Sequence, residues 1–167
     1  MPYASALDSA AARNAIAGGD MRETARYFRE SGNNPVQNIT ATPGYLTPGT
    51  NLINLATGTN TMFLPAATGS QDQVRVVIQT TITSGSCIVK ARTNADFFVG
   101  GLTFSTAAFA AGSTIQLGGT DALLTLVAAS GGLKGSNILF TDLAPNLWLV
   151  SGFLSGTTPA AVDGAWA

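Results

Sequence analysis

Carboxylates are the main side chains of this 167-residue sequence that could do acid–base chemistry, because the chain contains no histidine. Beyond residue 35 and before residue 158, the acidic residues are Asp72, Asp96, Asp121 and Asp142. Each stands beside a predicted turn, where aspartate commonly bonds to its own backbone. A glycosidase needs two carboxylates about 5 to 10 Å apart, and the spacing brings no pair together on one element. We therefore predict no catalytic residue, and an enzyme is the weakest hypothesis.

Other groups that could act as nucleophiles or bind phosphate lack the neighbours that such chemistry needs. The glycine-containing segments 117–119 and 130–132 are not followed by the lysine and helix start of a phosphate-binding loop. Ser155 in SGFLSG does not match a nucleophile elbow, and no histidine could activate it. Cys87, the single cysteine, falls in a predicted strand, so we expect a buried, unreactive thiol without a disulfide or a zinc site. We expect no cofactor and no metal.

Charged residues make up only 10% of the sequence, against about 25% in an ordinary soluble domain. The net charge of −1 gives no general attraction to nucleic acid or to anionic lipid. The mean hydropathy is +0.27, yet no apolar run reaches the roughly 18 residues of a spanning helix, and the N-terminus lacks the pattern of a secretory signal. This composition favours protein surface buried against protein surface, in a core or between copies of the chain.

The first 34 residues predict two short helices. The first begins near Ser5 and ends before Gly18, and the second begins at Asp20 and ends at Gly32. The second helix carries a basic stripe at helical spacing, formed by Arg22, Arg26 and Arg29. We predict that this stripe contacts an anionic partner; the alternative is a solvated face paired with neighbouring glutamates.

A change in composition separates these helices from a β-rich region. Residues 35–48 contain three prolines and little periodicity, which suits an extended linker. We therefore predict a helical arm and linker at residues 1–47, a β domain at 48–156 and a tail at 157–167. In the β domain, short β-branched and apolar runs alternate with turn residues. The predicted strands are Asn51–Ala56, Thr61–Leu64, Val74–Ile82, Ser86–Arg92, Phe97–Val99, Ser113–Leu117, Ala122–Ala128, Asn137–Phe140 and Leu147–Phe153.

The run 74–82 gives the clearest strand, because Val74, Val76 and Ile78 alternate with other residues. Residues 83–85 then predict a hairpin turn into the run 86–92, which makes these two strands antiparallel neighbours. No segment between the predicted strands is long enough for a crossover helix. We therefore predict a mainly β fold, an antiparallel β-sandwich or jelly-roll-like barrel, with a short α-helical N-terminal arm.

The aromatic residues are candidates for the core, for a contact between chains and for sugar binding. Trp148, in the last predicted strand, is expected in the core. Trp166 lies one residue from the end of the sequence, where we predict that it docks on a neighbouring chain. Phe97, Phe98 and Phe104 could stack on sugars if they lie on exposed loops.

Several segments of the β domain follow one another in a recognisable order. Phe63-Leu64-Pro65 ends one strand, and ATGSQDQVRVVIQTTITSGSCIVKAR supplies a turn, a valine-rich strand and a partner strand. DFFVGGLTF, AAGSTIQL and NLWLVSGFLSG come next. Over about residues 50 to 156, this order resembles a β-structured module of bacteriophage virion proteins, notably fibre proteins and trimeric capsid decoration proteins.

The resemblance implies a homotrimer whose arm or rim binds the major capsid protein. The sequence has no heptad or collagen-like shaft, which favours decoration over fibre. We therefore expect a virion structural protein, a decoration or cement protein on the outer capsid surface, assembled in the host cytoplasm. In it, the capsid contacts are Arg22, Arg26 and Arg29, and the inter-subunit contact is Trp166. The alternative is a receptor- or carbohydrate-binding module of a tail fibre, spike or head fibre. Neither hypothesis includes direct nucleic acid binding or a membrane.

Overall fold

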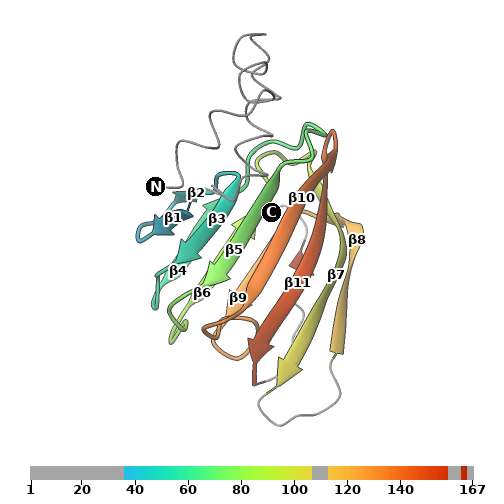
Figure 1. Cartoon of the computed structure of the whole chain (residues 1–167). Coiled ribbons are helices and arrows are strands. Elements are labelled where there is room, and N and C mark those ends of the chain that lie inside the picture. The colour runs from blue at the N-terminus through green and yellow to red at the C-terminus, as the bar shows by residue number, and fades with distance from the viewer. Residues whose placement is uncertain (1–35, 107–112, 158–162, 165–167) are drawn as a thin grey trace, which may run out of the picture. The chain divides into compact units, whose positions relative to one another are not determined.

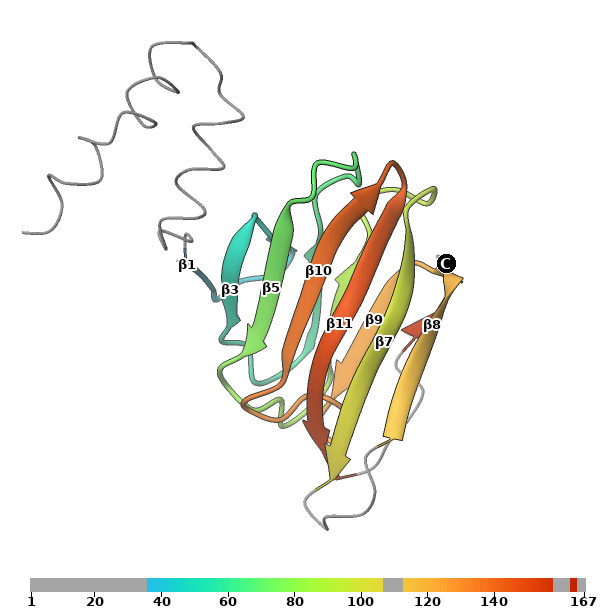
Figure 2. The ribbon, with the colours of Figure 1, turned by 45° about the vertical axis from the view of Figure 1, so that its right-hand side comes forward.

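The computed structural model describes residues 36–106, 113–157 and 163–164, and this part of the chain forms two β-sheets. The seven strands of the first sheet, in spatial order, are β1 (Val36–Ile39), β3 (Gly49–Ile53), β5 (Gln73–Ile78), β10 (Asn137–Ala144), β11 (Leu147–Gly156), β7 (Phe97–Thr106) and β8 (Ser113–Asp121). The five strands of the second are β12 (Asp163–Gly164), β9 (Leu123–Val127), β6 (Ser86–Lys90), β4 (Thr59–Phe63) and β2 (Gly44–Tyr45). Figure 1 shows β5, β10, β11 and β7 side by side, and β9 lies behind this sheet there and in Figure 2. The prediction of a mainly β fold is confirmed.

The first six strands alternate between the two sheets. As a result, β1, β3 and β5 run parallel in one sheet, and β2, β4 and β6 run parallel in the other. Because each connection crosses between sheets, the strands can pair in parallel without a crossover helix. Backbone hydrogen bonds extend this stacking beyond the strand ends, from Asn54 N–H to the Ile39 carbonyl and from Leu46 N–H to the Phe63 carbonyl.

The predicted hairpin turn at residues 83–85 is wrong, because β5 and β6 belong to different sheets. β5 ends at Ile78, and the chain then crosses to the second sheet. This connection runs along the one between β3 and β4, since the Thr83 N–H donates to the Ala56 carbonyl at 2.7 Å. The backbone N–H of Thr83 is therefore satisfied by a hydrogen bond to another connection, and not by a hairpin between β5 and β6.

The prediction that the strands pair only antiparallel is also wrong. Antiparallel pairs do occur between β10 and both β5 and β11, between β9 and both β6 and β12, and between β7 and β8. However, β11 pairs in parallel with β7 along its whole length, and the first six strands form only parallel pairs with one another. Both sheets are therefore mixed, unlike the antiparallel sheets of a jelly roll.

All nine predicted strands are present, and β7, β8, β10 and β11 extend further than expected. The structure adds β1 and β2 in the segment expected as a linker, and β12 in the segment expected as a tail. The compact unit that contains the strands begins at Val36, upstream of the predicted boundary at residue 48. These added strands have four, two and two residues, too few for periodicity to mark them.

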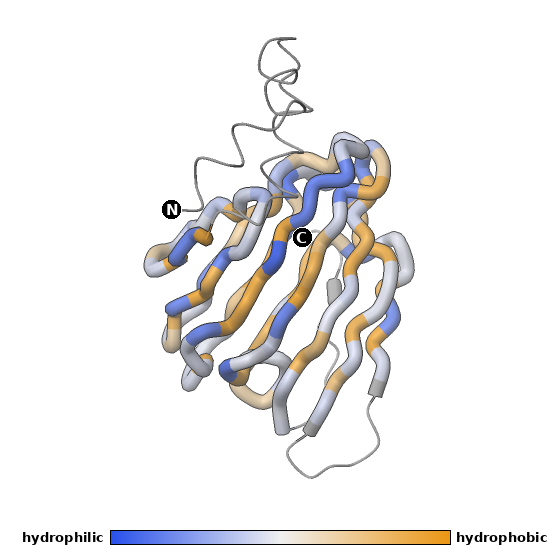
Figure 3. Tube along the Cα trace, in the orientation of Figure 1, coloured by the Kyte–Doolittle hydropathy of each residue, from blue (hydrophilic) through white to orange (hydrophobic). Residues whose placement is uncertain are grey.

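Alternation along β5 places its apolar side chains in the core, as predicted. Val74, Val76 and Ile78 are buried, whereas Arg75 between them is exposed. Figure 3 shows the same change between apolar and polar residues along the neighbouring strands. One face of β5 therefore packs into the core between the two sheets.

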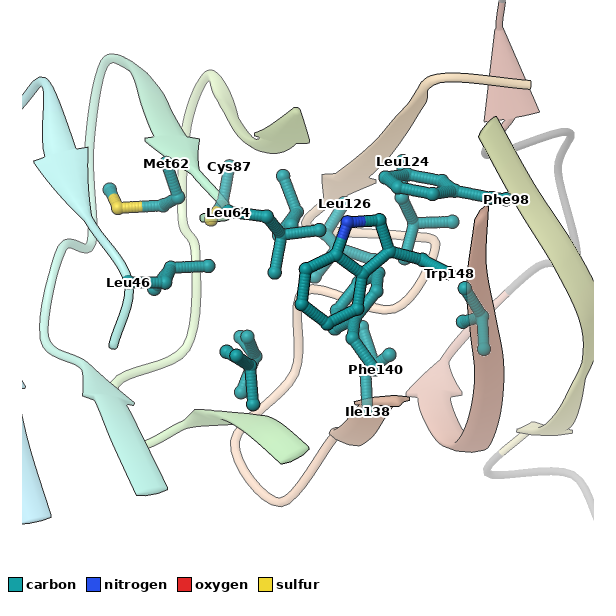
Figure 4. Close-up of a cluster of buried hydrophobic side chains, with 14 of the residues drawn as sticks. Leu46, Met62, Leu64, Cys87, Phe98, Leu124, Leu126, Ile138, Phe140 and Trp148 are labelled. Carbon is teal, nitrogen blue, oxygen red and sulfur yellow. The ribbon is translucent and has the colours of Figure 1, made fainter. Parts of the chain in front are cut away.

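Both sheets contribute to a single apolar core. Figure 4 shows Trp148 and Phe140 of the first sheet in the same cluster as Leu124 and Leu126 of the second. Phe98 joins them, its ring centroid 5.4 Å from that of Phe140. The Trp148 side chain is 1% exposed, which confirms its predicted core position. Burial of such large side chains contributes roughly 1.5 to 3 kcal/mol each to folding.

Candidate functional site

The predicted contact residues lie outside the part of the chain that the structure describes. They are Arg22, Arg26, Arg29 and Trp166. Their assignment to capsid and inter-subunit contacts therefore stays a prediction. The described residues offer other candidate sites: the carboxylates, the cysteine and the outer faces of the two sheets.

Asp142 holds a loop at residues 68–70 through its side chain. The carboxylate is 2% exposed and accepts hydrogen bonds from the N–H groups of Thr68, Gly69 and Ser70 at 2.7 to 3.1 Å. The hydroxyls of Thr68 and Ser70 also donate to Oδ2, both at 2.9 Å. Asp142 therefore caps a loop, but the prediction that it caps its own local turn is wrong, because the loop lies 72 to 74 residues earlier in the chain.

The five donors around Asp142 decide its ionisation. Burial by itself raises the pKa of the carboxyl, but the backbone bonds from Thr68, Gly69 and Ser70 and the Ser70 hydroxyl outweigh burial and lower the pKa from its ordinary value of 3.8. The group is ionised at neutral pH and its oxygens are already bonded. This arrangement suits a structural anchor and not a catalytic acid or base.

Asp96 and Asp121 also interact with the backbone near them. Asp96 is buried and accepts from the Thr93 N–H at 3.3 Å, and Asp121 accepts from the Gly118 N–H at 2.8 Å. These two bonds confirm the predicted turn roles. In the described ranges, no three histidine, cysteine, aspartate or glutamate residues come together to hold a metal ion.

Cys87 lies in β6 with its side chain in the core. Desolvation by burial raises the pKa of its thiol to about 12. The thiol is therefore protonated at neutral pH and screened from reagents, and the prediction of a buried thiol is confirmed.

The three phenylalanines considered as a sugar platform do not lie on loops. Phe97, Phe98 and Phe104 belong to β7, and Phe98 and Phe104 are 0% and 1% exposed. The interpretation of these residues as an exposed platform is wrong, because alternation along a strand buries every second side chain.

The outer face of the seven-stranded sheet is almost uncharged. Along its four central strands, β5, β10, β11 and β7, Arg75 is the only charged residue among those that alternate outward. The same face exposes three large apolar side chains: Leu143 at 40%, Leu149 at 38% and Phe153 at 43%. A protein partner that covered this face would desolvate few charged groups.

The outer face of the five-stranded sheet carries a different group of side chains. The strand register aligns Tyr45 of β2, Phe63 of β4, Lys90 of β6 and Leu123 of β9 in one row across the sheet. Their neighbours Gly44, Met62, Val89 and Leu124 are buried, so the row faces outward. The row brings together residues from four distant parts of the chain.

Arg92 completes this group, which we call the Tyr45 cluster: Tyr45, Phe63, Lys90 and Arg92. The rings of Tyr45 and Phe63 stack with centroids 5.8 Å apart and an interplanar angle of 25°. The Arg92 guanidinium lies 5.2 Å from the centre of the Tyr45 ring, within cation–π range. The sequence gives no signal for this cluster, since its members are up to 47 positions apart and share no motif.

No family model matches the chain, and comparison with curated proteins and with solved structures finds no match either. Within the described ranges, the structure contains no helix long and apolar enough to cross a membrane.

Proposed function

We propose that the protein is a structural component of a bacteriophage virion, a decoration or cement protein that binds the head surface as a trimer and stabilises the shell. The observation that carries this proposal is the outer face of the seven-stranded sheet. It holds one charged residue on its four central strands and exposes Leu143, Leu149 and Phe153. Such a face loses little free energy to desolvation when it is covered by a second copy.

The major capsid protein as partner and the three-fold symmetry come from the resemblance of residues 50 to 156 to trimeric decoration proteins. Because residues 36–39 and 44–45 are strands, we confine the attachment arm to residues 1–35, with Arg22, Arg26 and Arg29 facing the major capsid protein. A protein that binds only the assembled shell stabilises it by mass action. Packing of the three copies around a three-fold axis belongs to the same proposal.

The mass of the protein in solution tests the symmetric assembly. Light scattering should give three times the chain mass of 17.0 kDa. Leu149→Lys introduces a charge on the proposed contact face and should give the monomer mass, whereas Thr59→Lys, on an exposed position of the other sheet, should leave the trimer intact. A monomeric parent protein would contradict the trimer.

Binding to shells tests the decoration role separately. The full chain should saturate empty mature capsids at a fixed stoichiometry, and deletion of residues 1–35 should abolish uptake while the light-scattering mass remains that of a trimer. Absence of saturable uptake by the full chain would refute decoration.

The second candidate is a carbohydrate- or receptor-binding module of a fibre or spike. The Tyr45 cluster favours it, because stacked aromatic rings and a guanidinium on one outward face are groups that bind sugars. A glycan array separates the two candidates, since saturable sugar binding without shell binding supports the module alone.

A further inference from the structure

The Tyr45 cluster gathers aromatic and cationic side chains on a surface with little other charge. Tyr45 is 55% exposed, and Arg92, two residues past the row position of Lys90, is also exposed. The Arg92 guanidinium contacts the Tyr45 ring, and no described carboxylate forms an ion pair with it. The nearest carboxylate in sequence, Asp96, is 1% exposed and accepts from the Thr93 N–H. The cluster thus presents positive charge beside apolar rings.

We propose that Tyr45, Phe63 and Arg92 form a binding site for an acidic sugar, a pyranose that carries a carboxylate. The C–H face of a pyranose packs on aromatic side chains, and a guanidinium binds a carboxylate through paired N–H donors. The contact with Tyr45 holds the guanidinium in place before binding, which reduces the ordering that binding requires. This site is independent of shell attachment, which the proposed function assigns to residues 1–35.

The dimensions and charge of the surroundings favour a sugar over a larger anion. Adjacent strands lie about 4.8 Å apart, so the row from Tyr45 to Lys90 spans about 10 Å, the length of one or two pyranose rings. The basic residues of the described ranges are Arg75, Lys90, Arg92 and Lys134, and Arg75 lies on the other sheet. Among these described residues, no basic stripe extends from the cluster, so they offer a nucleic acid too few phosphate contacts.

The geometry of the sheet edge disfavours a bound peptide strand. β2 forms the edge of the five-stranded sheet beside the cluster, but it has only two residues and follows Pro43. A strand needs a longer edge for backbone pairing. Recognition at this site must therefore come from side chains.

Calorimetric titration of the full chain tests the site. Trigalacturonate and 3′-sialyllactose represent two sources of a carboxylated pyranose, and maltotriose and lactose are their neutral controls. We expect at least one acidic sugar to bind with a dissociation constant of about 1 mM or below and the neutral sugars to bind about tenfold more weakly. Arg92→Gln should weaken binding about tenfold, while Arg75→Gln, the same charge change on the opposite sheet, should change it less than about twofold.

Several results would overturn the proposal. These are the absence of binding by either acidic sugar at about 10 mM, equal binding of neutral sugars, and equal losses in the two arginine variants. A glutamate hexapeptide or anionic vesicles that bind more tightly than both sugars would assign the cluster to another partner. Because Arg92 is exposed, unchanged thermal unfolding of Arg92→Gln serves as the folding control. Shell binding by the full chain should be unaffected by Arg92→Gln, which keeps this test separate from the decoration proposal.

Discussion

Replacement of Asp142 by asparagine should destabilise the folded protein, because Asp142 anchors the surface loop at residues 68–70. The carboxylate accepts from five donors on Thr68, Gly69 and Ser70. Asparagine keeps one acceptor oxygen and places an NH₂ group where the other oxygen was, so one donor loses its acceptor if Oδ1 is replaced and three lose theirs if Oδ2 is replaced. A hydrogen bond to a charged group contributes about 1.5 to 3 kcal/mol, but Thr68 and Ser70 are exposed enough for water to replace part of this. We expect a loss of about 2 kcal/mol in the free energy of unfolding.

The dependence of this loss on pH distinguishes the anchor from general packing. The folded-state pKa of Asp142 lies below the ordinary value of 3.8, so the ionised carboxylate contributes its full stabilisation above that value. The contribution disappears as the pH falls through the folded pKa. The difference between the parent protein and Asp142→Asn should therefore be largest near neutral pH and shrink as the pH is lowered below about 4.

Urea unfolding followed by tryptophan fluorescence measures both effects. Asp121→Asn is the matched control, because it removes the same charge but only one backbone bond, from Gly118; we expect it to cost about 0.5 kcal/mol. Equal losses in the two variants, or a loss in Asp142→Asn that stays constant down to acid pH, would refute the proposed anchor.

Three further substitutions or probes test the packing. Gly152→Ala should lower the free energy of unfolding by about 2 kcal/mol or more, because Gly152 has a φ of 147° and an added Cβ would lie 2.3 Å from the Asn137 carbonyl oxygen. Gly118→Ala is the control, because an added Cβ there meets nothing within 4 Å, and it should change the free energy by less than about 0.5 kcal/mol. Urea unfolding measures both. Trp148→Phe should cost less than about 2 kcal/mol, since the Nε1 donor is buried with no partner among the described residues and its removal offsets part of the lost volume; a cost equal to that of Trp148→Ala in thermal unfolding would contradict this. Cys87 should react with a thiol reagent only after unfolding, because its pKa is about 12; rapid labelling of the native protein, measured by absorbance, would show that the thiol is accessible.

The strands were predictable wherever local pattern and burial agree. In β5, alternation of Val74, Val76 and Ile78 marked both the strand and its buried face, since a residue's side of a strand follows from its position alone. β1 and β2 escaped prediction because four and two residues are too short for periodicity. Their stability comes from pairing with β3 and β4, which is information from elsewhere in the chain.

Strand pairing and the two sites depend on contacts between distant residues. The turn residues at 83–85 were compatible with a hairpin, yet β5 pairs with β3 and β10 instead. A local turn cap was expected of Asp142, but its carboxylate caps the loop at 68–70, which the sequence could not indicate. The Tyr45 cluster likewise exists only because β2, β4 and β6 stack in register.

By itself, the sequence determined that the chain is β-rich, that nine of its segments form strands, and that histidine chemistry is absent. These properties follow from residue type and from spacing over a few positions. The tertiary structure decided which strands pair, which loop Asp142 anchors and which side chains share an outer face. Those outcomes depend on long-range hydrogen bonds and burial, whose free energy is gained only when distant segments meet.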